Sequence, residues 1–310
     1  MPELEEVELF SEFLFQIRLF FKNRNFLEVE TPLLNSYTTP EPYIDSFVVE
    51  SNFYLIPSPE FNLKILLNHY KRNLFQISHA FRKGDKSPLH NREFLLLEWY
   101  HIGYNDDLLI LEIVELLKFL SNQIKGFNPV FDFSKKTVNE IFNEFLQMDY
   151  SKENLITIIE SYQLVEKKNF EFLNQESYDV LFYLVFLNLI EPKLNTENPL
   201  FITNYPKELR AYSKLKNQKE SSRFELFWKG LEIGNGFHEI TNREEQYLEF
   251  QANIRRRLEL NKPIYPLSMT FFNSFPLVEC AGVAIGLERL FMAFRNLKKI
   301  SQISFCDLWN

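Results

Sequence analysis

The chain has 310 residues, of which 45% are hydrophobic, and it carries a formal net charge of −8. This composition supplies a large core, while the acidic balance (pI ≈ 5.4) provides no general attraction for nucleic acid and argues against tRNA as a partner. Because the chain has only 2 cysteines, we expect no disulfide framework. It shows no basic leader and no apolar run near the ~20 residues of a membrane span, so we expect a cytoplasmic protein with no membrane partner.

The first segments of the chain predict a helix followed by short strands. Residues 8–25 repeat phenylalanine and isoleucine at helical spacing, which indicates an amphipathic helix. The stretch FLEVETPLL (26–34) alternates and then breaks at Pro32, so it predicts a short strand with a proline end. Further strands are expected near 46–56.

Two further regions predict helices. Ser58 is expected as the N-cap of a helix whose first position is Pro59. Residues 105–190 are mainly helical in pattern. No linker composition marks a boundary, so we expect a single catalytic domain over 1–310 with a mainly helical insertion at about 105–195.

Residues 73–101 predict two long strands joined by a polar loop. Because alternate residues of a strand share a face, four functional side chains would lie together on one side of this hairpin. They are Arg82, Phe94, Glu98 and Tyr100. An arginine, an aromatic ring and a carboxylate there suit a site that stacks a ring and holds anionic groups. The alternative is an ordinary hairpin with a charged, solvated face.

A second hairpin is predicted around a turn at Lys229 and Gly230. Its strands would make Glu225 and Glu232 diagonal neighbours, about 7–8 Å apart. Two carboxylates at that separation can approach one Mg²⁺, although an exposed pair on a solvated strand is the alternative. No spacing of histidines predicts a zinc site, and His238 is expected to pack or hydrogen-bond rather than to catalyse.

Two glycine-bearing stretches suggest close approach to a ligand. In GNGFHEIT (234–241), we expect Gly234 and Gly236 to let the backbone pass near a bound molecule. GVAIGLERL (282–290) predicts a strand, a glycine turn and a helix with Arg289 in its first turn, which suits a polyphosphate. A glycine turn beside a surface arginine is the alternative.

Together these stretches resemble the catalytic domain of the class II aminoacyl-tRNA synthetases, an α+β fold with an antiparallel β-sheet flanked by helices. FLEVETPLL resembles motif 1, FRKGDKSPLHNREF motif 2 and GVAIGLERL motif 3, over roughly residues 10–308. SPE, LEWY and GLEIGNGFHEIT narrow the resemblance to the lysyl branch. Motif 1 begins too early for an anticodon-binding domain, and Ser58, His238 and Ala284 agree with the elongation factor P (R)-β-lysine ligase family.

The resemblance implies an ATP-dependent, AMP- and pyrophosphate-forming ligase. It would activate (R)-β-lysine or lysine as an aminoacyl-adenylate, with Mg²⁺, and transfer it to the ε-amine of a lysine on elongation factor P. A homodimer is implied as well.

The resemblance also implies roles for individual residues. The catalytic residues would be Arg82 and Arg289. The ATP-binding set would be Arg82, Lys83, Gly84, His90, Asn91, Phe94, Glu232, Ile233, Gly286 and Arg289. The substrate-binding set would be Ser58, Pro59, Glu60, Glu98, Tyr100, Asn235, Glu239 and Ala284. Glu225 and Glu232 would hold the metal.

One position departs from the family pattern. Motif 2 of the family reads F-R-x-E, but here Gly84 replaces the glutamate and Asp85 follows it. That glutamate helps to seat the nucleotide, so either Asp85 takes its place or ATP binds more weakly. Two alternatives to the ligase stay open. One is a free-standing lysyl-tRNA synthetase-like enzyme with a tRNA or other acceptor, and the other is a non-catalytic paralogue that binds ATP or an amino acid.

Overall fold

The computed structural model of the chain describes residues 2–50, 52–84 and 87–304. Its large sheet contains β1 (Leu27–Glu28), β5 (Leu74–Phe81), β6 (Glu93–Ile102), β7 (Ser134–Thr137), β8 (Leu200–Thr203), β9 (Arg223–Trp228), β10 (Leu231–His238) and β11 (Cys280–Gly286). The strand order is β1-β5-β6-β11-β10-β9-β8-β7. A small sheet, ordered β2-β4-β3, contains β2 (Leu34–Asn35), β3 (Val48–Val49) and β4 (Phe53–Leu55).

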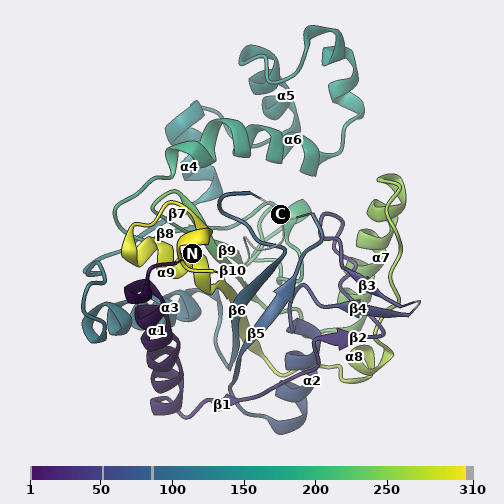
Figure 1. Cartoon of the computed structure of the whole chain (residues 1–310). Coiled ribbons are helices and arrows are strands. Elements are labelled where there is room, and N and C mark those ends of the chain that lie inside the picture. The colour runs from purple at the N-terminus through teal and green to yellow at the C-terminus, as the bar shows by residue number, and fades with distance from the viewer. Residues whose placement is uncertain (1, 51, 85–86, 305–310) are drawn as a thin grey trace.

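The pairing pattern refines the expected sheet. The strands from β5 to β8 in this order pair antiparallel, as predicted, but the two edge strands β1 and β7 pair parallel with their neighbours. The sheet is therefore mixed, and the fold is α+β. Helices flank it on both sides (Figure 1). They are α1 (Leu4–Asn23), α2 (Glu60–Tyr70), α3 (Asp106–Gln123), α4 (Val138–Leu146), α5 (Lys152–Ser161), α6 (Tyr178–Val185), α7 (Arg243–Glu259), α8 (Met269–Asn273) and α9 (Leu287–Arg295).

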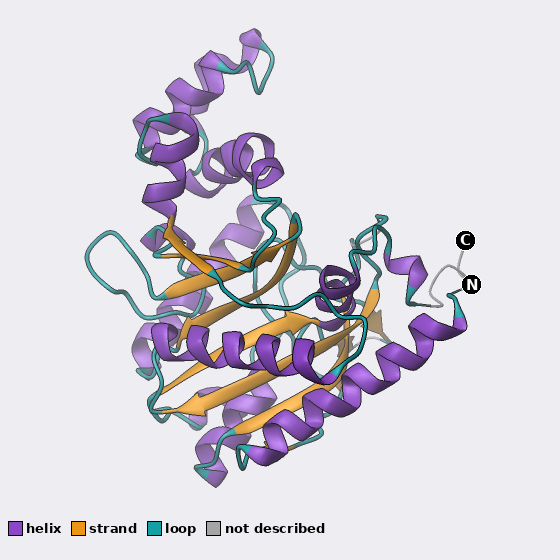
Figure 2. Cartoon of the chain, turned by 90° about the vertical axis from the view of Figure 1, so that its left-hand side faces the viewer, coloured by secondary structure: helices purple, strands orange, loops and turns teal. Residues whose placement is uncertain are grey.

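One face of the large sheet is covered by α1, α3 and α9, and this is the main core (Figure 2). The apolar stripe predicted for the first helix supplies Phe13, Ile17 and Phe20, all fully buried. Helix α1 begins at Leu4, four residues earlier than expected. Because this layer fills one face of the sheet, the opposite face is left for a site.

The start of α2 differs from the prediction by one residue. The helix begins at Glu60, and Pro59 rather than Ser58 occupies the N-cap position. The Ser58 hydroxyl still accepts a hydrogen bond from the backbone N–H of Glu60, at 3.0 Å. Ser58 therefore supports the helix start from one position further out, and its side chain is directed toward β6, where it meets Glu98.

Helices α4, α5 and α6 stand together at one end of the molecule, above the sheet (Figure 1). They form a second hydrophobic cluster with β8 and with Phe227 of β9. Helix α3, in contrast, packs against α1 in the main core. The single domain with an insertion at about 105–195 stays a prediction.

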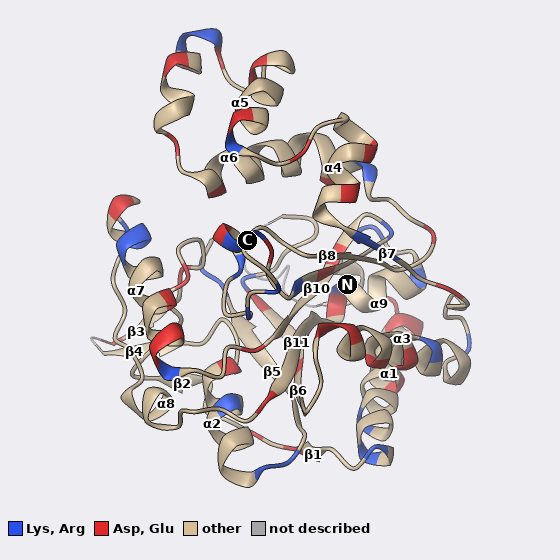
Figure 3. Ribbon diagram, turned by 180° about the vertical axis from the view of Figure 1, so that it is seen from behind, with Lys and Arg blue, Asp and Glu red and all other residues tan. Residues whose placement is uncertain are grey.

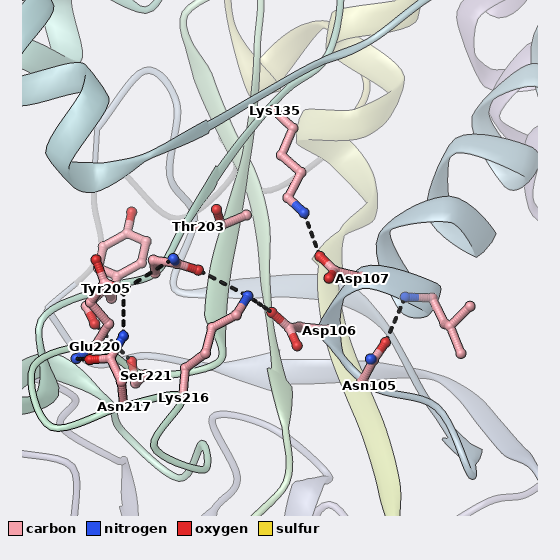
Figure 4. A network of polar contacts seen from close by, with 12 residues as sticks. Asn105, Asp106, Asp107, Lys135, Thr203, Tyr205, Lys216, Asn217, Glu220 and Ser221 are labelled. Atoms are coloured by element: carbon pink, nitrogen blue, oxygen red, sulfur yellow. Dashed lines mark hydrogen bonds and ion pairs between the residues drawn. The ribbon is translucent and has the colours of Figure 1, made fainter.

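Polar contacts fasten the segment after β8 to the start of α3 (Figure 4). The ammonium of Lys216 lies 3.5 Å from Asp106 and donates to Asn204 at 3.2 Å. Lys135 of the edge strand β7 pairs with Asp107 beside it. Within the residues that the structure describes, no helix is both long and apolar enough to cross a membrane.

Candidate active site

The open face of the large sheet carries a row of functional side chains. Strand register places Glu98 opposite Ala284, Ala284 opposite Asn235, and Asn235 opposite Glu225. These residues come from β6, β11, β10 and β9 in turn, so one line crosses four adjacent strands. The row depends on chain segments far apart in sequence that hydrogen bonding brings into register.

The first hairpin has the predicted parity. Pairing of β5 with β6 sets Ala80 opposite Phe94 and Gln76 opposite Glu98, which leaves Arg82, Phe94, Glu98 and Tyr100 on one face. The other face packs into the main core through Phe75, Leu97 and Trp99. The alternative of a merely solvated charged face is wrong, because Glu98 is 2% exposed and Tyr100 is 3% exposed.

A cavity of ≈ 870 Å³ lies over this row. All of the residues expected to bind the amino acid line it: Ser58, Pro59, Glu60, Glu98, Tyr100, Asn235, Glu239 and Ala284. Residues of the helical cluster and of α7 also line it, among them Tyr183, Asp179 and Arg256. A row of polar groups on the sheet is thus roofed by helices, which shields the polar groups from bulk water.

Three carboxylates converge at one end of this cavity, from Glu60, Glu98 and Glu239. Glu98 is held from two sides, since the Ser58 hydroxyl donates to Oε2 at 2.7 Å and the Tyr100 hydroxyl donates to Oε1 at 2.6 Å. Burial, and then the charge of Glu60, raise the pKa of Glu98 to about 7. A cation arriving here would relieve both effects, so this end of the cavity suits an ammonium group.

Glu239 is the most enclosed of the three carboxylates. It is 1% exposed, and burial raises its pKa to about 8 against the opposing charge of Lys64. Its Oε1 has no hydrogen-bond partner among the described residues. A Cβ added at Gly282 would lie 2.9 Å from this oxygen and would collide with the Tyr100 ring. Glycine at 282 therefore keeps the space in which Glu239 and Tyr100 sit side by side.

A second, smaller cavity of ≈ 80 Å³ adjoins the first. Most of the expected ATP-binding residues line it, namely Arg82, His90, Asn91, Phe94, Glu232, Ile233, Gly286 and Arg289. Lys83 and Gly84 lie outside its lining. Arg82, Asn235 and Ala284 line both cavities, so the two spaces meet at these residues.

Polar atoms without partners mark the junction between the cavities. The Arg82 Nε and the Asn91 Nδ2 are buried and have no hydrogen-bond partner in the described part of the chain. The Arg82 guanidinium lies 5.1 Å from the centre of the Phe94 ring. Buried donors without partners are costly unless a ligand satisfies them, so these atoms favour an anionic group next to a flat ring.

The arginine of the third motif faces the same small cavity. Arg289 donates through Nη1 to the backbone oxygen of Glu232 at 2.8 Å, and this Nη1 lies 3.9 Å from the Glu232 carboxylate. Its Nη2 contacts His90. The alternative of a surface arginine is wrong, since these contacts hold Arg289 against the β10 strand and the second-motif loop.

The expected metal pair has the predicted turn but a modified register. Lys229 and Gly230 both have positive φ, of 54° and 75°, and join Trp228 to Leu231 as predicted. A bulge between Glu232 and Gly234 then shifts the ladder, so that Glu225 faces Asn235. The two carboxylates differ in exposure, because Glu225 is 6% exposed whereas the Glu232 side chain is 41% exposed.

Glu225 already has two donors, the Tyr205 hydroxyl and Arg223, each at 2.5 Å. Burial raises its pKa, and the charge of Glu232 raises it further. Glu232 lines the small cavity, whereas Glu225 is absent from the lining of both cavities, so the pair as an Mg²⁺ site stays a prediction. No group of three or more metal-binding side chains occurs within residues 2–50, 52–84 and 87–304.

The two glycines expected near a ligand have a packing role, and the approach of their backbone to a bound molecule stays a prediction. A Cβ at Gly234 would collide with the backbone oxygen of Ala284, and one at Gly236 would collide with the Phe224 ring. Both missing side chains therefore face neighbouring protein rather than a ligand. Gly234 does line the small cavity through its backbone.

The remaining sequence predictions concern single residues. His238 pairs with Glu279 at 2.5 Å, which confirms the expected hydrogen-bonded histidine; that it takes no part in catalysis stays a prediction. Cys280 is buried, and burial raises the pKa of its thiol. Cys306 and Asp85 lie outside the described residues, so the proposed substitution of Asp85 for the missing glutamate is a prediction on which the structure says nothing.

Sequence reasoning missed three charged residues at the site. Lys64 is buried between Glu60 and Glu239, and its spacing of four from Glu60 on a helix was the available signal. Arg223 lines the large cavity and pairs with Glu225, two positions along the same strand face. Glu41 also lines the cavity, but it lies in a proline-containing loop whose sequence predicts no direction.

An antiparallel centre bearing these three motifs, with a carboxylate pocket joined to an arginine-lined pocket, defines the catalytic fold of a class II aminoacyl-tRNA synthetase. Comparison with known families agrees, since the family described as tRNA synthetases class II (D, K and N) matches residues 4–306. The chain belongs to this family. Membership implies that its reaction uses ATP.

Individual relatives are similar over nearly their whole length. "Elongation factor P--(R)-beta-lysine ligase" of Buchnera aphidicola subsp. Schizaphis graminum is 33% identical, over 94% of this chain and 92% of that protein. The protein of the same name from Haemophilus ducreyi is 30% identical, over 94% and 90%. "Elongation factor P--(R)-beta-lysine ligase homolog" of Aquifex aeolicus is 34% identical, over 96% and 98%.

Proposed function

We propose that this protein is an ATP-dependent ligase that activates (R)-β-lysine or lysine and transfers it to the ε-amine of a lysine on elongation factor P. One observation carries the proposal. A buried cage of three carboxylates opens into the same cavity as the unpartnered guanidinium nitrogen of Arg82. An amino acid with a cationic side chain fits between them, with its ammonium in the cage and its carboxylate toward the arginine.

The first proposed step forms an aminoacyl-adenylate. A carboxylate oxygen of the amino acid attacks the α-phosphorus of ATP, the bond to the next phosphate breaks, and pyrophosphate leaves. The Arg82 guanidinium would stabilise the negative charge on the α-phosphate, while Arg289 would hold the terminal phosphate. Phe94 lies in the small cavity with both arginines and would stack on the adenine.

Mg²⁺ would be held by Glu225 and Glu232 and would neutralise charge on the phosphates. In the second proposed step the ε-nitrogen of the acceptor lysine attacks the carbonyl carbon, AMP leaves, and the nitrogen loses a proton to solvent. No covalent intermediate with the protein is required, so positioning by the cage and by the arginines would supply the catalysis.

Two features favour a protein acceptor over tRNA. The relatives that match over nearly their whole length bear the name of an elongation factor P ligase. The net charge of −8 also disfavours a phosphate backbone, and Figure 3 shows acidic residues interspersed with basic ones over most helices. Because the acceptor is a translation factor, we propose that the reaction takes place in the cytoplasm. We also propose that the protein is a homodimer, which light scattering after size-exclusion chromatography would test.

Pyrophosphate exchange tests the first step. We expect ATP–pyrophosphate exchange that depends on (R)-β-lysine or on lysine, and none without an amino acid. Intact mass of elongation factor P, incubated with the enzyme, ATP and the amino acid, tests the second step and should show one added lysyl unit. Exchange with no lysine isomer would favour the non-catalytic paralogue, which the glycine at position 84 keeps as the second candidate.

A further inference from the structure

The amino-acid end of the large cavity contains a cation of the protein's own. Lys64 extends from α2, one turn after Glu60, and its side chain is 1% exposed. Its Nζ lies 2.5 Å from Glu60 Oε1 and 2.6 Å from Glu239 Oε2. The carboxylate cage is therefore partly neutralised before any amino acid arrives.

Lys64 approaches these carboxylates from behind the cavity wall. Glu60 and Glu239 line the cavity, whereas Lys64 is absent from the lining formed by the described residues. Each carboxylate thus has one side toward Lys64 and another toward the open space. On Glu239 the ion pair distinguishes the two oxygens, since Oε2 lies 2.6 Å from the Lys64 ammonium and Oε1, also buried, has no hydrogen-bond partner in the described chain.

The charges at this end of the cavity explain why such a cation is useful. Three carboxylates and Lys64 leave a charge of −2 when all four are ionised. The side-chain ammonium of a lysine or β-lysine would reduce this charge to −1. Without Lys64 the cage would hold three carboxylates facing one another, and the pKa of Glu239 would rise further, because the charge of Lys64 opposes the effect of burial.

We propose that Lys64 is a positioning residue for amino-acid recognition: it turns Glu60 and Glu239 toward the cavity and favours the charged form of Glu239, so that the two carboxylates receive the substrate's side-chain ammonium. This inference rests on the proposed function and deepens it, since it names what sets the charge of the amino-acid site. Lys64 would act through the two carboxylates and would not touch the substrate.

The titratable groups that face Lys64 come from several elements. They are Glu60 on α2, Glu98 and Tyr100 on β6, Tyr212, Glu239, and Cys280 on β11. The ring centres of Tyr100 and Tyr212 lie 5.6 and 5.8 Å from Nζ. Buried tyrosine and cysteine here keep their protons, because burial raises the pKa of each. Glu98 and Glu239, with pKa values of about 7 and about 8, are left as the groups that titrate near neutral pH.

Kinetics of pyrophosphate exchange at several pH values tests the proposal. At pH 7 we expect Lys64→Met to raise the KM for the amino acid by about tenfold or more, with the KM for ATP changed by less than about twofold. The deficit should narrow as the pH rises toward 9, because the carboxylates then ionise without help. Lys64→Arg keeps the charge and should recover most of the loss at pH 7.

The outcomes that overturn the proposal are specific. An unchanged amino-acid KM in Lys64→Met would overturn the proposal. An equal rise of this KM in Lys64→Met and Lys64→Arg at every pH would also overturn it, because the shape of the Lys64 side chain, and not its charge, would then matter. If Lys64→Met does not fold, Lys64→Gln takes its place, because it removes the charge and keeps a polar group that can donate to Glu60 and Glu239. The same rise in the amino-acid KM is expected, and an unchanged KM would overturn the inference. Wild-type protein that activates no lysine isomer would instead overturn the proposed function itself.

Discussion

Replacing Glu239 by glutamine tests the assignment of the amino-acid site most directly. The substitution keeps the shape of a side chain that is 1% exposed and removes its charge. In the wild-type protein we expect Oε1, which has no partner among described residues, to accept a charge-assisted hydrogen bond from the substrate ammonium. Such a bond contributes about 1.5–3 kcal/mol.

That free energy corresponds to a loss of about 10- to 150-fold in kcat/KM for the amino acid. The KM for ATP should change by less than about twofold, because Glu239 lines the large cavity and the small one is formed by other residues. Pyrophosphate exchange, with each substrate varied in turn, measures both quantities in one assay.

Glu279→Gln is the matched control for this experiment. Glu279 lies next to Cys280, whose backbone oxygen accepts from the Glu239 N–H, but its side chain is 53% exposed and pairs with Lys214 and His238. Loss of this exposed carboxylate should leave exchange within about twofold of wild type. Equal losses for ATP and amino acid in Glu239→Gln, or an equal effect of the control, would show that the pocket is misplaced.

Three further predictions concern pH and single residues on the sheet face. Burial and the charge of Glu60 raise the pKa of Glu98 to about 7, and a substrate ammonium binds better to the ionised carboxylate. The KM for the amino acid should therefore fall as the pH rises from 6 to 8. A KM that rises over this range contradicts the assignment. Gly84→Glu restores the glutamate of motif 2 at a position where an added Cβ meets nothing within 4 Å. It should lower the KM for ATP in exchange assays by about threefold or more. An unchanged KM would show that this glutamate is not needed here. Ala284→Gly removes one methyl group opposite Glu98 and should shift the ratio of kcat/KM for α-lysine over (R)-β-lysine by about fivefold; an unchanged ratio would show that Ala284 does not discriminate between them.

The sheet face could be predicted because strand geometry has a period of two. Arg82, Phe94, Glu98 and Tyr100 are separated by a loop, yet their parity alone placed them together, and the β5–β6 register confirms it. The turn at Lys229 and Gly230 was equally local. Such features depend only on residues that are close together along one hairpin, so they can be predicted from the local sequence.

Other features depend on which strands become neighbours. The glycines at 234 and 236 looked like contacts to a ligand, but their missing side chains face Ala284 and Phe224, from β11 and β9. The strand order brings in Ala284, whereas Phe224 belongs to the predicted hairpin and lies opposite Gly236 because of the bulge. That bulge lies in β10, between Glu232 and Gly234, and it also sets Glu225 opposite Asn235.

Lys64 shows a third reason why the sequence alone does not predict the whole site. Its spacing from Glu60 predicts an ordinary surface pair on a helix, and the second partner, Glu239, is 175 positions away. Nothing local says that α2 is buried against β5 and β6. A lysine is also among the residues least often buried, so composition argued against the position it holds.

The helical cluster of α4, α5 and α6 has its own hydrophobic core, yet α6 supplies part of the cavity roof. Asp179 on α6 meets Tyr43 and Arg256, which belong to the body of the protein. The cavity is thus built from two regions, since its floor comes from the strands and part of its wall comes from a helical cluster that also packs on β8 and β9. Substitutions within this cluster could therefore reshape the wall of the cavity while the row of side chains on the strands stays the same.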